Sequence, residues 1–137
     1  MFRFAALAVF SLIGCATQPL AIDKSALVPA SRMLAPQWTV QAQYTGSLVI
    51  KRDSGFMGSA CNVRVFVDAV PVADLAPSEK VELFVALGEH VVGAASTGMF
   101  CGGGASEAAV VITPERQRIL RVAAGQSGDL HLQPSAF

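Results

Sequence analysis

The sequence has no excess of charge, because ten Lys and Arg residues balance ten Asp and Glu residues among its 137. This balance gives no electrostatic basis for binding nucleic acid, so no nucleic-acid partner is expected. The apolar stretch Phe4 to Ile13 is shorter than the roughly 20 residues that a membrane-spanning helix needs. The length allows a single domain. Hydrophobic residues are abundant, at 53%, which is enough to fill a core and excludes a wholly disordered chain.

Cysteine occurs only three times, and the odd number sets one residue apart from any intramolecular pair. Residues 1–14 have one charge, Arg3, before an apolar run, a pattern typical of a secretory signal peptide. The sequence Leu12-Ile13-Gly14-Cys15 resembles the lipobox of bacterial lipoprotein precursors. This resemblance implies cleavage before Cys15 and fatty acylation of Cys15, which would anchor the chain in a membrane. The alternative is an ordinary signal that ends at Cys15.

The residue after the lipobox cysteine is Ala16 rather than Asp. By the sorting rule of that family in Gram-negative cells, Ala16 implies the periplasmic side of the outer membrane. Residues 15–37 contain three prolines and no sustained hydropathy period. They are predicted to form a flexible, lipidated tether with one helical turn near Ala30 to Leu34. Residues 38–137 are predicted to form the folded domain.

The domain has no helical stripe, and its apolar residues instead alternate with a period of two. Val63, Val65 and Val67 illustrate this alternation, and Gly, Pro, Asp and Ser turns separate such segments. The pattern predicts an all-β, antiparallel β-sandwich of about seven strands. The predicted strands are 46–52, 63–68, 81–86, 88–97, 107–113, 117–124 and 129–133.

Three adjoining segments, Val65 to Leu75, Glu79 to Val85 and Leu87 to Val92, resemble a PEGA-type β domain. The stretch Arg52 to Cys61 and the last six residues resemble a group of small proteobacterial lipoproteins of unassigned function. The family implies an immunoglobulin-like sandwich and export, and it implies no reaction. PEGA-type turns usually have Gly after Asp68, where this chain has Ala69. The substitution predicts a looser or longer hairpin.

Cys61 and Cys101 remain as a pair, and an exported protein meets an oxidising compartment. They are predicted to form a structural disulfide that closes a loop of about 40 residues. A metal site with His90 and His131 is a weaker alternative, because zinc ligands usually come in closely spaced pairs. A catalytic thiol is another weak alternative, because the chain has few helices whose N-terminus could lower the pKa of a thiol, and no C-x-x-C motif.

No residue is assigned a catalytic role, and no metal or cofactor is expected. The run Gly102 to Gly104 lacks the Lys and Ser/Thr of a phosphate-binding loop and is interpreted as a turn beside the disulfide. His90 and His131 are expected on exposed strand faces. No carboxylate pairs with another in an apolar context, and most are expected to be solvated on turns or strand faces.

Two loops carry apolar side chains at their tips: Phe56 and Met57 precede Cys61, and Met99 and Phe100 precede Cys101. The first interpretation is that these side chains cover the core around the disulfide. The second is that they form a partner-binding surface, since loops at the ends of β-sandwiches commonly bind partners.

The sequence therefore predicts a lipid-anchored cell-envelope protein with a non-catalytic binding or scaffolding role, and an envelope protein or cell-wall component as its partner. The alternative function is a periplasmic inhibitor or immunity protein. Such a protein would bind a hydrolase through an apolar loop such as Asp53 to Ala60.

Overall fold

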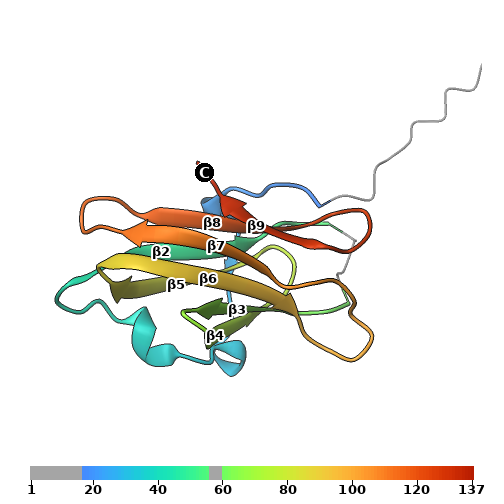
Figure 1. The fold of residues 1–137 in the computed structure, drawn as a ribbon, viewed down its shortest axis with the longest axis horizontal. Coiled ribbons are helices and arrows are strands. Elements are labelled where there is room, and N and C mark those ends of the chain that lie inside the picture. The colour runs from blue at the N-terminus through green and yellow to red at the C-terminus, as the bar shows by residue number, and fades with distance from the viewer. Residues whose placement is uncertain (1–16, 56–59) are drawn as a thin grey trace, which may run out of the picture.

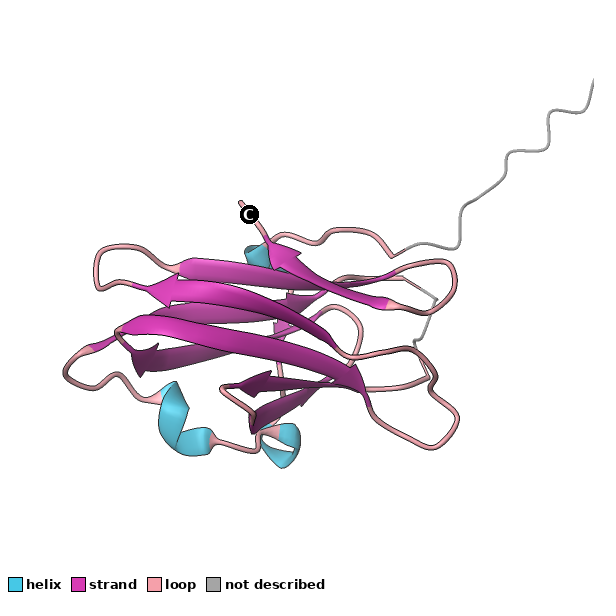
Figure 2. Ribbon diagram, in the orientation of Figure 1, coloured by secondary structure: helices cyan, strands magenta, loops and turns pink. Residues whose placement is uncertain are grey.

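The computed structural model describes residues 17–55 and 60–137 and contains two stacked β-sheets (Figure 1). The first sheet has the order β1-β5-β2-β8-β9, and the second has the order β4-β3-β6-β7. Three short 3-10 helices lie outside the sheets (Figure 2). The predicted β-sandwich is confirmed. The elements are η1 (Ile22–Lys24), β1 (Ala26–Leu27), η2 (Ala30–Arg32), η3 (Pro36–Thr39), β2 (Thr45–Arg52), β3 (Val63–Val67), β4 (Val70–Leu75), β5 (Glu79–Ala86), β6 (Gly88–Ser96), β7 (Ser106–Ile112), β8 (Arg118–Ala124) and β9 (Leu130–Pro134).

The core lies between the two sheets and is built from alternate residues of the strands. Val63, Val65 and Val67 of β3 are buried, while the residues between them face outward. Strand β2 is different because it is buried on both faces from Leu48 to Arg52. Leu48 and Ile50 belong to the core between the sheets, whereas Val49 is buried on the outer face of the first sheet.

Two pairs of strands are parallel, which differs from the predicted all-antiparallel arrangement. Strand β2 pairs with β8 in parallel, and the two residues of β1 pair with β5 in parallel. The chain crosses from the second sheet to the first between β7 and β8, and no tight hairpin then imposes an antiparallel pairing. Strands β1 and β4 were not predicted. Strand β4 is an edge strand, where Pro71 is tolerated because a missing N–H breaks no interior ladder.

The predicted flexible tether over residues 15–37 is wrong from residue 17 onward, because this segment packs on the sandwich. Val28 N–H donates a hydrogen bond to Lys80 O at 2.8 Å, and Leu34 N–H donates one to Val72 O at 2.9 Å. Ala35 is buried in the core. The helical turn is present as η2, directly after Pro29. The segment covers the edges of both sheets, which would otherwise expose unpaired main-chain groups.

The hairpin between β3 and β4 is tighter than predicted. Val67 pairs with Val70, so the turn consists of Asp68 and Ala69 alone. Both residues have positive φ, at 49° and 65°, as a two-residue turn of this kind requires. The Asp68 side chain compensates by accepting a hydrogen bond from Val91 N–H at 2.9 Å. No helix in the described part of the chain is long and apolar enough to cross a membrane.

Candidate functional site

The candidate site lies at the end of the sandwich where Cys61 and Cys101 form a disulfide. Cys61 lies just before β3, and Cys101 lies in the loop between β6 and β7. Their Cα atoms are 6.2 Å apart, within the usual range for disulfides. The predicted pairing is confirmed. The bond connects the start of β3 to a long loop of the same sheet.

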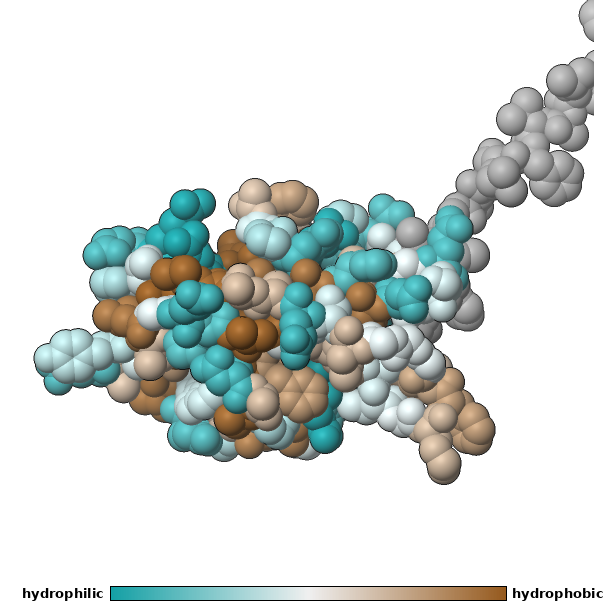
Figure 3. Space-filling view, viewed as in Figure 1, coloured by the Kyte–Doolittle hydropathy of each residue, from teal (hydrophilic) through white to brown (hydrophobic). Residues whose placement is uncertain are grey.

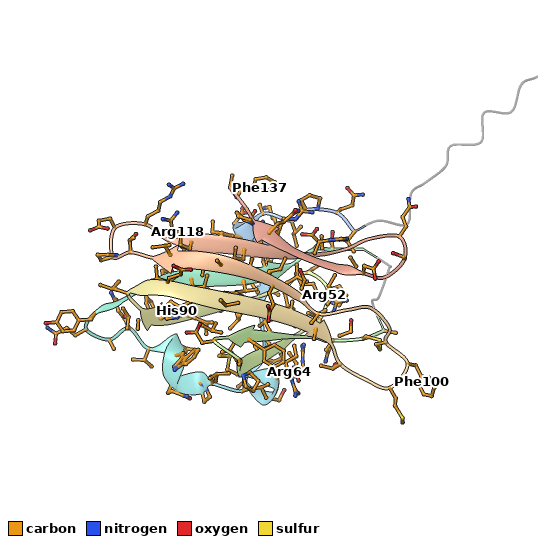
Figure 4. The ribbon with its side chains drawn as sticks, viewed as in Figure 1. Arg52, Arg64, His90, Phe100, Arg118 and Phe137 are labelled. Atoms are coloured by element: carbon orange, nitrogen blue, oxygen red, sulfur yellow. A yellow bond between two sulfur atoms is a disulfide. The ribbon has the colours of Figure 1, made fainter. Side chains whose placement is uncertain are left out.

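Arg52 closes the core at this end. Its Nη1 donates hydrogen bonds to Cys61 O at 2.7 Å and to Leu75 O at 2.9 Å. The side chain therefore joins the end of β2 in the first sheet to the main chain around β3 and β4 in the second (Figure 4). Burial lowers the pKa of Arg52, and the charge of Glu79 opposes this shift. Arg52 thus fixes the main chain at Cys61, one of the two disulfide cysteines.

The loop before Cys101 projects into solvent. Met99 is 93% exposed and Phe100 is 96% exposed. Phe100 points away from the sandwich in Figure 4. The interpretation that Met99 and Phe100 cover the core is therefore wrong. Figure 3 shows an apolar protrusion at this end. Phe56 and Met57 lie outside the described residues.

A hollow of about 240 Å³ separates this loop from the turn between β8 and β9. Cys101, Gly102 and Gly103 line one side, and Ala124 and Gly128 line the other. A Cβ atom on Gly103 would lie 2.9 Å from Gly128 O, and Gly103 has a φ of 108°. The two loops approach so closely that a side chain at Gly103 would not fit. The glycine run thus lies beside the disulfide, as predicted.

A charged cluster is buried on the outer face of the first sheet, beneath residues 17–25. The ammonium group of Lys51 donates hydrogen bonds to Leu20 O and Phe137 O and lies 4.7 Å from the centre of the Phe137 ring. Burial lowers the pKa of Lys51, while the charge of Asp53 opposes the shift and that of Arg121 adds to it. Lys51 therefore fixes both the N-terminal segment and the last residues to the sheet.

Asp53 and Arg121 complete this cluster. Arg121 Nη2 donates a hydrogen bond to Asp53 Oδ2 at 2.6 Å, and the Asp53 side chain is fully buried. Thr17 Oγ1 lies 3.4 Å from the same oxygen. Asp53 Oδ1 and Arg121 Nε have no hydrogen-bond partner among the described residues. The ion pair holds β2, β8 and the first described residue together.

A second ion pair lies at the other end of β6. His90 Nδ1 is 2.5 Å from Asp68 Oδ2, and His90 Nε2 is 2.7 Å from Ala86 O. Both neighbours are acceptors, so the doubly protonated ring satisfies both contacts. Burial lowers the pKa of His90, but the hydrogen bonds to Asp68 and Ala86 outweigh it and raise the pKa overall. The expectation of an exposed His90 is wrong, since its side chain is 12% exposed.

The four residues of the alternative metal site do not lie together. Cys61 and Cys101 are bonded to each other, and His90 lies near the start of β6, at the other end of the sandwich. His131 is exposed on β9. Among residues 17–55 and 60–137, no group of three or more His, Cys, Asp or Glu side chains is placed to hold a metal ion.

A separate, mostly apolar hollow of about 430 Å³ lies where the N-terminal segment crosses β5, between Leu27, Met33 and Phe84.

Sequence reasoning missed the roles of Lys51, Arg52 and Asp53. The available signal was their position: three consecutive charged residues directly follow the apolar run Leu48 to Ile50. Charges that continue a buried strand need partners, because an unpaired buried charge is costly. The partners themselves are main-chain oxygens and a distant arginine, which leave no mark in the local sequence.

Comparison of the chain with protein-family models, with curated proteins and with solved structures finds no match. The resemblance to PEGA-type domains and to small lipoproteins therefore stays a prediction.

Proposed function

We propose that the chain is an exported, lipid-anchored protein of the cell envelope with a non-catalytic binding or scaffolding role. In this proposal residues 1–14 are removed, Cys15 is acylated, and the domain lies at the periplasmic face of the outer membrane. The observation that carries the proposal is the Cys61–Cys101 disulfide. Such bonds persist in oxidising compartments, and the lipobox-like sequence before Cys15 supplies the route to one.

The contacts of Arg52, Lys51 and His90 within the fold support a binding or scaffolding role. Arg52 binds two main-chain oxygens between the sheets, Lys51 binds the main-chain oxygens of Leu20 and Phe137, and His90 joins the Asp68 side chain to Ala86 O. The hydrogen bonds of these ionisable groups therefore join parts of the fold to one another. The exposed loop with Met99 and Phe100 leaves an apolar surface for contact with another component.

The anchor is tested by fractionating cells that express the parent chain or a Cys15→Ser variant. We expect the parent in the membrane fraction and the variant in the soluble fraction of the envelope, because the acyl chains provide the attachment. A Ser11→Ala variant, which leaves the lipobox-like sequence intact, serves as the matched control and should stay in the membrane fraction. Equal distribution of the parent and Cys15→Ser chains would refute the anchor.

The binding role is tested by chemical crosslinking in intact cells, followed by isolation of the acylated chain. A scaffold should crosslink to wall or membrane components, whereas an inhibitor should give a stoichiometric complex with one hydrolase. The inhibitor hypothesis remains the second proposal. Asp53, at the start of its proposed loop, is buried and paired with Arg121, so the inhibitory contact would have to come from the later part of the loop.

A further inference from the structure

The described chain is hydrogen-bonded to the sandwich from its first residue. Ala124 N–H donates a hydrogen bond to Thr17 Oγ1 at 3.0 Å, and Thr17 N–H donates one to Ala124 O at 3.4 Å. The next residue, Gln18, forms an antiparallel bridge with Ser54. In the sequence only Ala16 separates Cys15 from Thr17, the first described residue.

This attachment point lies at the end of the sandwich that carries the disulfide loop. Ala124, which binds Thr17, also lines the hollow beside Phe100 and Cys101. In Figure 1 the coloured ribbon begins, at residue 17, at the same end of the sandwich as the loop between β6 and β7. Figure 4 shows Phe100 at the outermost part of that loop.

The loop has the composition of a segment that enters a lipid interface. Ser96 to Ala105 contains no Lys, Arg, Asp, Glu or His. Met99 and Phe100 are almost fully exposed, and the disulfide of the next residue, Cys101, ties the loop to the chain just before β3. An apolar, uncharged loop tip loses little energy by desolvation and gains from burial in an apolar medium.

We infer that this loop contacts the lipid bilayer, with Met99 and Phe100 inserted at the boundary between headgroups and acyl chains of the membrane that holds the lipid anchor. The inference rests on the proposed acylation of Cys15. Two Cα–Cα steps from Cys15 to Thr17 span at most about 7 Å. The polar layer on each side of a bilayer is about 5–7 Å thick. An anchor this short places the disulfide end of the domain against the membrane and leaves no room for a freely swinging domain.

The opposite end of the sandwich provides the matched control. Tyr44 is also exposed, at 75%, and lies just before the first residue of β2. Ser54, which forms the bridge to Gln18, lies just after the last residue of β2. The eight residues of β2 separate these positions by about 25 Å. Tyr44 should therefore face away from the membrane that Phe100 contacts.

The test uses the acylated full chain in phosphatidylcholine vesicles whose acyl chains carry bromine, which quenches nearby tryptophan fluorescence. Phe100→Trp and Tyr44→Trp variants are compared with the parent, in which Trp38 supplies the same background. We expect the added tryptophan at Phe100 to be quenched at least about threefold more than that at Tyr44, because only the former enters the acyl boundary. Because the loop is uncharged, added phosphatidylglycerol or salt should leave this ratio unchanged.

Equal quenching of the two variants, or stronger quenching at Tyr44, would overturn the inference. Quenching at Phe100 that requires anionic lipid would also overturn it. Burial of the Phe100 position by a crosslinked envelope protein, without quenching by lipid, would assign the loop to a protein partner instead.

The molecular mass of the protein in the same preparations separates the two proposals. Without an acyl group both fail, whereas an acylated chain without selective quenching refutes only the membrane contact.

Discussion

His90 couples its charge state directly to the fold. Its ring joins the Asp68–Ala69 turn to the main chain at Ala86, near the turn between β5 and β6. The pKa of His90 is raised above 6.5 and that of Asp68 is lowered below 3.8. The raised pKa of His90 contributes stability that is complete below the unfolded value and is lost as pH rises through the folded value. The lowered pKa of Asp68 contributes stability that is lost as pH falls through its folded value.

Replacing His90 by Gln should therefore lower the free energy of unfolding most between about pH 4 and 6.5. We expect a loss of about 0.5–1 kcal/mol, since half of the Asp68 side chain is solvent-exposed. The difference should shrink at higher pH. Urea unfolding at several pH values measures it, with His131→Gln, a change at an exposed position, as the control. A difference that stays constant from pH 5 to 9 would contradict the ion pair.

Ala69 is a residue in a backbone conformation that favours glycine, with a φ of 65°. Replacing Ala69 by Gly should raise the free energy of unfolding by about 0.5–1 kcal/mol, because glycine adopts positive φ without steric cost. The same change at Ala109, an exposed residue of β7, should lower stability by a similar amount. Thermal unfolding of both variants measures the difference. Destabilisation by Ala69→Gly would show that the turn is not strained.

At the scale of elements, a bidentate ion pair between Arg32 and Glu79 attaches η2 to the sandwich. Arg32 donates hydrogen bonds to both carboxylate oxygens of Glu79, at 2.6 and 2.7 Å, and a further one to Asp74 O. Burial raises the pKa of Glu79, but hydrogen bonds from Arg32 and Ala76 outweigh it, so the pKa is lowered overall. A lowered carboxyl pKa contributes stability above the unfolded value, and this contribution is lost on acidification.

Replacing Arg32 by Ala should lower the free energy of unfolding by about 1–2 kcal/mol at neutral pH. The effect should diminish as pH falls below 4.5, where Glu79 of the unfolded chain is protonated. Arg64→Ala is the matched control, because Arg64 makes the same kind of pair with Asp74 at a more exposed position. Denaturant titration compares the two, and equal losses would show that burial does not strengthen the Arg32 pair.

The period of two along the sequence was sufficient to predict most strands, because alternate residues of β2, β3 and β5 to β9 face a common core. Strand β4 was missed because a bulge between Val65 and Phe66 shifts its register and its apolar residues do not alternate. The N-terminal segment was missed because main-chain hydrogen bonds attach it, and these impose no hydropathy period. The sequence left two interpretations open for Met99 and Phe100, because apolarity alone does not reveal whether a loop side chain turns into the core or into solvent.

At the scale of the whole molecule, the disulfide and the buried charges connect segments that are far apart in the sequence. The Cys61–Cys101 bond links residues 40 positions apart. Arg52 joins the two sheets at the same end, and Lys51 and Asp53 hold the N-terminal segment to the outer face. The end of the domain that follows the proposed anchor is thus crosslinked by a disulfide and by hydrogen bonds of buried charged side chains.

Replacing both cysteines by Ser should lower the free energy of unfolding by roughly 4 kcal/mol, the chain-entropy value for a loop of this length. The double substitution avoids a free thiol. Reduction of the parent chain with a thiol reagent should give the same loss, measured by denaturant unfolding with and without the reagent. A double variant as stable as the parent would show that Arg52 and the core suffice without the bond.

The most direct test of the proposed anchored protein is a mass spectrum of its N-terminal peptide, isolated from detergent-solubilised cell envelopes. We expect a peptide that begins at Cys15 and carries a diacylglyceryl thioether and an amide-linked acyl chain, together with disulfide-linked peptides that contain Cys61 and Cys101. An unmodified N-terminal peptide that retains residues 1–14, or free thiols at Cys61 and Cys101, would contradict the proposal.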